Sequence, residues 1–201
     1  MKAVRQAFTR ESADARRAEL IAATAAVLAE HGLAGTNVRA ICAKAGVSPG
    51  LLRHYFKGID DLVAATYQAT SDRMDAIFVD AVDGAGPDPR ARLNAYLTAS
   101  FRPPVTDPEL LGAWTAFWAL ARSDAQMAAV HAASYAGYRA RLAELIALCG
   151  VALDDAAKLA VLLTAMVDGL WLELSLDPGS FGAAAAAAMV EQAVGALLPP
   201  H

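Results

Sequence analysis

Apolar residues recur at three- and four-residue spacing along most of the chain, which is the period of a helix that buries one face. The first such face contains six residues: Leu20, Ile21, Thr24, Val27, Leu28 and His31. The strict alternation of apolar β-branched and polar residues that marks a strand is nearly absent. The pattern therefore predicts an all-α protein, with a first helix that ends near Gly32.

Two short helices follow the first one. Thr36 or Asn37 is expected to cap a helix that runs to about Lys44, and Gly46 closes it. Ser48 then caps a helix of about two turns, with a proline in its first turn, where a missing N–H costs nothing. This order predicts two short helices joined by a glycine turn.

The remainder of the chain divides into longer helices at Gly- and Pro-containing breaks. A fourth helix starts at Gly58 and runs to about Val82, and the next breaks fall at "DGAGPDP", "FRPPVTDP", Ser123-Asp124, "CGVALDD" and "DPGS". The last two helices are expected at about 154–176 and 180–198. About nine helices result.

Composition narrows the class of protein. Hydrophobic residues make up 56% of the 201-residue chain, which is enough to fill a sizeable core. Cys42 and Cys149 lie far apart, which favours a reduced, cytoplasmic protein without a disulfide. The apolar run 159–176 approaches membrane length, but Asp168 and Glu173 would be costly in lipid, so we expect an interface helix and no membrane partner.

Charge is distributed unevenly. Residues 1–57 carry nine Lys and Arg against four Asp and Glu, whereas residues 58–201 carry eight against seventeen. A basic N-terminal module beside an acidic body is typical of a protein whose first part meets a polyanion.

Catalytic motifs are missing. The histidines and cysteines lack metal-ligand spacing, and neither a nucleophile elbow nor a phosphate loop occurs. We therefore expect no enzyme activity, no metal and no cofactor.

The two short helices carry the composition of a helix-turn-helix, which inserts its second helix into the major groove of double-stranded DNA. In this region the chain resembles the TetR family, whose pattern is matched by Thr36, Ile41, "AGVS" at 45–48, Gly50, "YF" at 55–56 and Leu62. The stretch "HYF" followed by "LVAAT" is similar to the choline-sensing BetI-type branch. Arg53 and Ile59 depart from the pattern: many members have tyrosine at the first position, and most have a phosphate-binding lysine at the second, whose contact Lys57 partly replaces.

The resemblance implies a regulator, most often a repressor, that binds an inverted-repeat operator as a homodimer and responds to a small-molecule effector. Residues 1–57 would form the DNA-binding domain. Residues 58–201 would form the ligand-binding and dimerisation domain, with the last two helices in a four-helix bundle across the twofold axis. A helical interaction or ligand-binding module that does not bind DNA is the alternative.

Candidate DNA contacts follow from side-chain chemistry as well as from the resemblance. Residues expected at phosphates are Thr36, Asn37, Arg39, Lys44, Tyr55 and Lys57. Residues expected at base edges, on the helix capped by Ser48, are Pro49, Gly50, Arg53 and His54. The alternative treats the two lysines as solvated surface and His54 as a packing residue.

The candidate effector site rests on the three tryptophans. Trp114, Phe117 and Trp118 share one helix face, and Asp168 and Trp171 share another. On weaker grounds, His131, Tyr135 and Tyr138 of the seventh helix line the same site. An aromatic wall with a carboxylate suits a quaternary ammonium ion. A core aromatic stripe with a hydrophobic effector elsewhere is the alternative.

Overall fold

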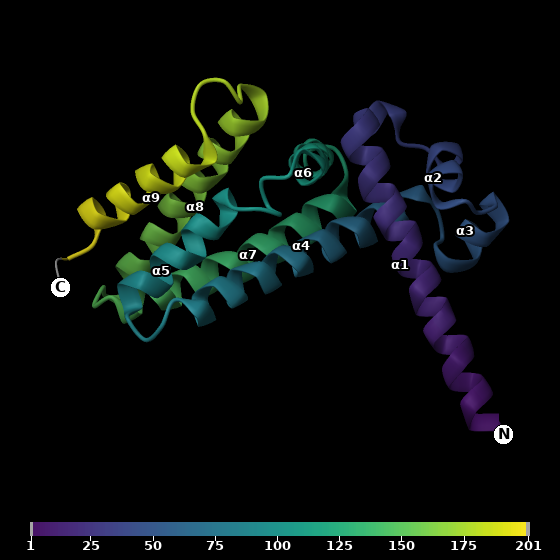
Figure 1. Cartoon of the computed structure of the whole chain (residues 1–201), viewed down its shortest axis with the longest axis horizontal. Helices are drawn as coiled ribbons and strands as arrows, with labels where there is room; N and C mark the ends of the chain where they lie inside the picture. Colours follow the sequence, from purple (N-terminus) through teal and green to yellow (C-terminus); the bar gives the residue numbers. More distant parts are fainter. Residues whose placement is uncertain (1, 200–201) are drawn as a thin grey trace.

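The computed structural model describes the backbone of residues 2–199 and the side chains of residues 13–199. Within this range the chain is all-helical: α1 (Lys2–Gly35), α2 (Val38–Ala45), α3 (Pro49–Tyr55), α4 (Ile59–Gly84), α5 (Pro89–Thr98), the 3₁₀ helix η1 (Ala99–Phe101), α6 (Pro108–Ala121), α7 (Ala125–Leu148), α8 (Leu153–Leu176) and α9 (Ala183–Leu197). Figure 1 shows α1 to α3 at one end of the molecule and α5, α8 and α9 at the other, with α4 and α7 between them.

Local capping fixes the short helices. The side chain of Asn37 accepts a hydrogen bond from the Ala40 N–H at 3.0 Å, so Asn37 is the cap of α2. Thr36 instead donates its hydroxyl to the Gly32 carbonyl at 2.7 Å. Ser48 accepts from the Leu51 N–H at 3.2 Å at the start of α3, as the sequence predicts.

The regular part of α1 ends where the sequence predicts. Gly32 has φ 59° and ψ −167°, which lie outside helical geometry, and a short further helical segment then runs to Gly35. A glycine adopts this conformation at little cost.

Two hydrophobic cores meet along α4. The smaller core holds α2 and α3 against α1 through seven residues: Leu20, Val27, Ile41, Cys42, Leu52, Phe56 and Leu62. The larger core fills the body formed by α4 to α9 and also includes Leu28 of α1; on α4 it begins with Val63, Ala64 and Tyr67, immediately after Leu62. The same helix therefore belongs to both cores.

Helix α8 is long and apolar enough, by length and composition, to cross a membrane. One side of α8 is nevertheless packed inside the protein, through Ala156, Ala160, Leu163, Thr164, Val167 and Trp171. Its other side exposes Val161 and Leu162, each with about half of its surface accessible, at 52% and 51%. This leaves an apolar face open at the surface of the body.

Helices α1 and α6 approach so closely that only glycine fits at one crossing point. A Cβ atom at Gly112 would lie 3.2 Å from both the Cα and the carbonyl oxygen of Ala29, which are backbone atoms. A Cβ atom added at Gly137, within α7, would have no neighbouring atom within 4 Å. We expect Gly137→Ala to raise stability by about 0.5–1 kcal/mol through helix propensity. We expect Gly112→Ala to lower it by roughly 1 kcal/mol or more through overpacking.

Thermal unfolding of the two variants beside the parent protein measures this contrast. Equal stabilisation by both substitutions would show that α1 and α6 move apart without cost.

Candidate functional site

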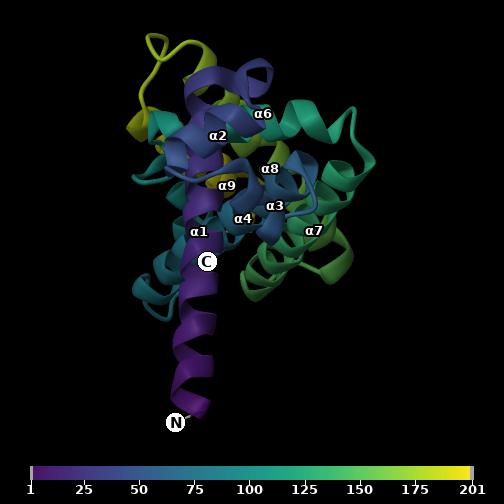
Figure 2. The same ribbon diagram turned by 90° about the vertical axis from the view of Figure 1, so that its right-hand side faces the viewer.

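The predicted DNA-contacting residues lie at the ends of α2 and along α3, and Figure 2 shows these two helices close together on one part of the molecule. Arg39, Lys44, Pro49, Gly50, Arg53, His54 and Lys57 are exposed, as are Asn37 and Ser48 at the two helix starts. Thr36 and Tyr55 are partly buried. Leu52 on the opposite side of α3 is fully buried, so α3 is fixed with its polar face outward.

The C-terminal end of α3 is held against α1. The Arg17 guanidinium donates to the Tyr55 carbonyl at 3.3 Å and stands 4.4 Å from the centre of the Phe56 ring. The rings of His54 and Tyr55 meet edge to face at 5.0 Å. These contacts orient α3 before any DNA is present.

Two of the predicted phosphate contacts have other roles in the structure. Lys44 forms an ion pair with Glu30 on the surface of α1, and this hydrogen bond and charge lower the pKa of Glu30. The Lys57 backbone N–H donates to the Asp61 carboxylate at 3.1 Å, which leaves the Lys57 side chain exposed. Ile59, where the family pattern has lysine, packs against both cores and has a structural role.

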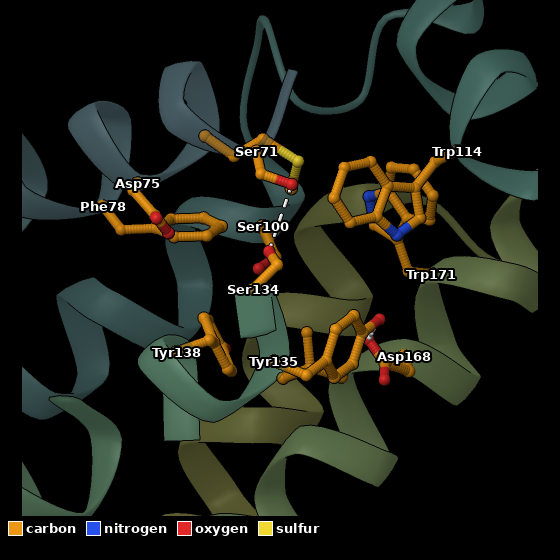
Figure 3. Close-up of a pocket in the computed structure, with 12 residues that line it drawn as sticks. Ser71, Asp75, Phe78, Ser100, Trp114, Ser134, Tyr135, Tyr138, Asp168 and Trp171 are labelled. Atoms are coloured by element: carbon orange, nitrogen blue, oxygen red, sulfur yellow. Dashed lines mark hydrogen bonds between the residues drawn. The ribbon is translucent and has the colours of Figure 1, made fainter. Parts of the chain in front are cut away.

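A small cavity of about 50 Å³ lies inside the body, between α4, η1, α6, α7 and α8 (Figure 3). Its wall is formed by twelve residues: Ser71, Met74, Asp75, Phe78, Ser100, Trp114, Ser134, Tyr135, Tyr138, Val167, Asp168 and Trp171. Figure 3 shows Asp75 and Phe78 on one side and Trp114, Trp171 and Asp168 on the other. The lining is thus aromatic and acidic.

The structure brings together four of the six predicted effector residues at this cavity: Trp114, Tyr138, Asp168 and Trp171. Phe117 does not line the cavity. It is fully buried, and its ring centre lies 4.7 Å from that of Tyr67. Trp118 also lies outside the cavity, and its indole N–H donates to the Tyr135 hydroxyl at 3.0 Å. Both therefore support lining residues.

The carboxyl of Asp168 ends a hydrogen-bonded chain that starts at Trp118. The Tyr135 hydroxyl, which accepts from Trp118, donates to Asp168 Oδ1 at 3.2 Å. Burial raises the pKa of Asp168 to about 6, although the Tyr135 hydrogen bond and the charge of Arg139 act against the shift. The carboxylate is therefore charged at neutral pH and held in one place.

Helix α4 contributes a wall that the sequence did not indicate. Ser71, Met74, Asp75 and Phe78 line the cavity at i, i+3, i+4 and i+7. Burial raises the pKa of the Asp75 carboxyl, with a smaller contribution from Asp72. The helical spacing of these four residues was the only signal in the sequence for this wall. Ser71 and Asp75 are polar, however, and polar residues are also typical of an exposed helix face.

Two buried polar atoms at the cavity have no hydrogen-bond partner among the described residues, the Tyr138 hydroxyl and the Trp171 indole nitrogen. Burying such groups unsatisfied costs free energy, and sites of this kind are commonly completed by water or by a ligand. Ser134 and Ser71 satisfy each other through a hydrogen bond of 3.1 Å. The cavity thus offers donors to a bound molecule as well as negative charge.

An exposed helix-turn-helix joined to a helical body with an internal cavity defines a DNA-binding regulator that responds to a ligand. Residues 20–66 match the family described as bacterial regulatory proteins, tetR family, and residues 89–199 match the C-terminal domain of BetI-type transcriptional repressors. The chain belongs to the TetR family of transcriptional regulators.

Known relatives agree with this assignment. An HTH-type transcriptional regulator BetI of Paraburkholderia xenovorans is 34% identical over 85% of this chain and 87% of its own length. The crystal structure of a transcriptional regulator from Pseudomonas aeruginosa PAO1 is 41% identical, with a TM-score of 0.83, over 92% of this chain and 90% of that one.

A more distant relative shares the fold. A transcriptional regulator from Saccharomonospora viridis, solved in complex with choline, has a TM-score of 0.81 at 16% identity, over 92% of this chain and 98% of that one. Together these comparisons confirm the predicted fold class and the prediction of a transcriptional regulator and not an enzyme, since the homologues are regulators.

Proposed function

We propose that this regulator is a homodimeric repressor of an inverted-repeat operator and that its effector is a small quaternary ammonium compound of the choline type. The observation that carries the effector proposal is the charge of the cavity lining. It contains Asp75 and Asp168, and none of the twelve residues that line it is a lysine, arginine or histidine. The lining therefore carries negative charge that a bound cation would balance.

The rings around the cavity suit the same ligand. Trp114 and Trp171 meet edge to face with ring centres 6.4 Å apart, and Phe78 and Tyr138 do so at 5.6 Å. A quaternary ammonium ion cannot donate a hydrogen bond, and it binds through ring faces and nearby negative charge. The unpartnered Tyr138 hydroxyl and Trp171 N–H are then available for a hydroxyl or carbonyl group of the same molecule.

The relatives support this choice of ligand class. The match to the BetI-type C-terminal domain covers residues 89–199 and so includes η1, α6, α7 and α8, which line most of the cavity. The Saccharomonospora viridis regulator of the same fold binds choline. A hydrophobic effector is the other outcome that the ligand experiments separate.

We place the boundary between the DNA-binding domain and the ligand-binding and dimerisation domain at 57/58, between the end of α3 and the start of α4. Arg53 and His54 read base edges from the exposed face of α3, with Pro49 and Gly50 at close approach. Thr36, Asn37, Arg39, Lys44, Tyr55 and Lys57 hold the phosphates on either side. Such a protein acts in the cytoplasm, where its operator lies.

The dimer interface is placed on the exposed apolar face of α8 and α9. Large apolar side chains that remain exposed there are Leu153, Val161, Leu162, Leu176, Met189 and Leu197. An apolar patch on this scale marks an interaction surface. A second copy related by a twofold axis would cover it with the same patch and would present two recognition helices to two half-sites.

Leu162→Arg is expected to dissociate the dimer, because it places a charge at the centre of this face. Light scattering at micromolar concentration should give the mass of a monomer, and operator affinity should fall about 100-fold or more, since one recognition helix alone is a weak binder. Val79→Arg, at an exposed apolar position on α4, is the matched control and should remain dimeric. A dimeric Leu162→Arg variant with normal DNA binding would place the interface elsewhere.

The function is tested with DNA fragments selected by the purified protein from random sequence. The selected fragments should contain an inverted repeat, and affinity should fall steeply with salt, as phosphate contacts require. Gel shifts with and without choline then show whether the effector changes operator binding. Selection of sequence without twofold symmetry would contradict the proposal.

A further inference from the structure

A second, open hollow adjoins the cavity on its α6–α7–α8 side. This groove has a volume of about 480 Å³ and is lined by Trp118, Ala121, Arg122, His131, Tyr135, Arg139, Asp168, Gly169 and Leu172. Tyr135 and Asp168 line both spaces. Only these two side chains are common to both linings, so they form the boundary between the cavity and the groove.

The groove is basic where the cavity is acidic. Arg122 is exposed, and Arg139 is partly buried with its guanidinium carbon 5.4 Å from the centre of the Tyr135 ring. Among residues 13–199 neither guanidinium makes a side-chain hydrogen bond or an ion pair within 4.0 Å, and Arg139 Nε is buried without a partner. A buried guanidinium N–H without an acceptor is costly, and a bound anion would supply a charge-assisted acceptor.

Asp168 does not supply that partner. Its hydrogen bond comes from the Tyr135 hydroxyl, and Arg139 acts on it only through charge at longer range. His131 does not add a charge at neutral pH, because burial and the nearby Arg139 lower its pKa, and its Nδ1 is engaged by the Tyr67 hydroxyl at 3.0 Å. Two guanidiniums thus lie on the groove side, the Asp168 carboxylate lies on the boundary, and the Asp75 carboxylate lies on the cavity side.

We infer that the groove binds a carboxylate and that the effector is a zwitterion, with its quaternary ammonium group in the cavity and its carboxylate on Arg139 and Arg122. This inference rests on the proposed cationic cavity and specifies the ligand that fills it. The two carboxylates and the two guanidiniums of the combined lining sum to zero charge. A zwitterion, which also has no net charge, can place an opposite charge beside each pair. Trimethylammonium carboxylates, of which glycine betaine is the smallest, have this chemistry.

The shape of the groups favours a carboxylate over other anions at Arg139. A guanidinium presents parallel N–H donors that match the two oxygens of a carboxylate, and the Tyr135 ring lies beside it. Choline would use the cavity alone and would leave the buried Nε of Arg139 unpaired. The ratio of the affinities for glycine betaine and choline therefore measures the contribution of the groove.

Calorimetry with glycine betaine, choline and 3,3-dimethylbutyrate tests the inference. The last compound has the shape and carboxylate of glycine betaine with carbon in place of nitrogen. The wild-type protein should bind glycine betaine about tenfold or more tightly than either of the others, because only glycine betaine makes both charge-assisted contacts. The wild-type affinities set the reference for the variants.

Arginine variants assign this preference to the groove. Arg139→Gln should weaken glycine betaine about tenfold or more while choline binds equally or more tightly, since a positive charge near Asp168 is removed. Arg122→Gln, at an exposed position that cannot disturb packing, should weaken glycine betaine several-fold without weakening choline. Arg141→Gln is the control on the same helix, where Arg141 pairs with Glu144 at 2.9 Å, and it should change neither.

The outcomes separate this inference from the proposed function. Choline binding that depends on Asp168, with no preference for glycine betaine, would reject the inference and leave the proposed function intact. Equal loss of both ligands in Arg139→Gln, together with no effect of Arg122→Gln, would show that Arg139 only supports the fold. If neither ligand bound while neutral 3,3-dimethylbutanol did, both the inference and the cationic effector would be rejected.

Discussion

Asp168→Asn is expected to remove most of the affinity for choline and to make the ligand-free protein more stable. The carboxylate is the charged end of the Trp118–Tyr135–Asp168 chain, and asparagine keeps the shape without the charge. Loss of a buried charge opposite a bound cation should weaken choline about 100-fold, in line with the cost of breaking a buried charge pair. The same loss removes the cost of burying that charge without its ligand.

The sign of the stability change follows from the pKa of Asp168. The folded-state pKa is raised to about 6 from the ordinary value of 3.8, so the folded protein holds this proton more tightly than the unfolded chain. The penalty is fully present above pH 6 and is relieved as the pH falls from about 6 to 4. At pH 7 asparagine should therefore raise stability by about 3 kcal/mol, the free energy that corresponds to the shift of this pKa.

Choline titrations and thermal unfolding between pH 4.5 and 8 measure both effects. In the parent protein choline affinity should fall below about pH 6 as the carboxylate is protonated. The variant should show weak binding without the loss of affinity that protonation of Asp168 causes, whereas Asp80→Asn, on the exposed side of α4, should behave as the parent. Unchanged choline binding in Asp168→Asn, or equal binding of 3,3-dimethylbutanol, would reject the cationic effector.

Arg53→Ala is expected to relax sequence preference at one base pair of each half-site. Arg53 is exposed on the outer face of α3, whose opposite side is anchored by Leu52. Loss of one bidentate arginine–guanine contact costs about 1–3 kcal/mol on specific DNA and little on random DNA. Tyr55→Phe should instead weaken specific and random DNA alike, because it removes a phosphate contact.

Gel shifts with the selected operator, its single-base variants and random DNA distinguish these two patterns. Arg73→Ala, at an exposed position on α4, should leave the affinity for each of these DNAs unchanged. Equal losses on specific and random DNA for both Arg53→Ala and Tyr55→Phe would contradict direct reading of bases by Arg53.

Local signals predicted the fold well because most of its elements are fixed by their own termini. Ser48 and Asp60-Asp61 mark the starts of α3 and α4, and both helices begin where the sequence indicates. The caps Thr36 and Asn37 could not be separated beforehand, because either side chain can accept the hydrogen bond that Asn37 makes. Gly32 gave the position of the kink but not the further helical turn after it.

The cavity could be predicted only in part. Periodicity places Trp114 and Phe117 on one face of α6, but it does not show that Phe117 faces Tyr67 while Trp114 reaches the cavity. The α4 wall was missed because Ser71 is buried only when α7 packs over it, and that contact joins residues 63 positions apart, Ser71 and Ser134, while Asp75 at the same wall stays exposed. Such pairing is a property of the tertiary fold.

The sharing of α4 between the two cores has a geometric consequence. With 26 residues this helix is a rod of about 39 Å, and it carries Leu62 at one end and Phe78 near the other. A tilt of about 5° imposed at the cavity would swing the far end through roughly 3 Å. In a twofold dimer both recognition helices would swing at once, against a DNA half-site spacing fixed at about 34 Å. In such a dimer helix α4 would act as a lever, and a small displacement of Phe78 by an effector would put the two α3 helices out of register with the operator.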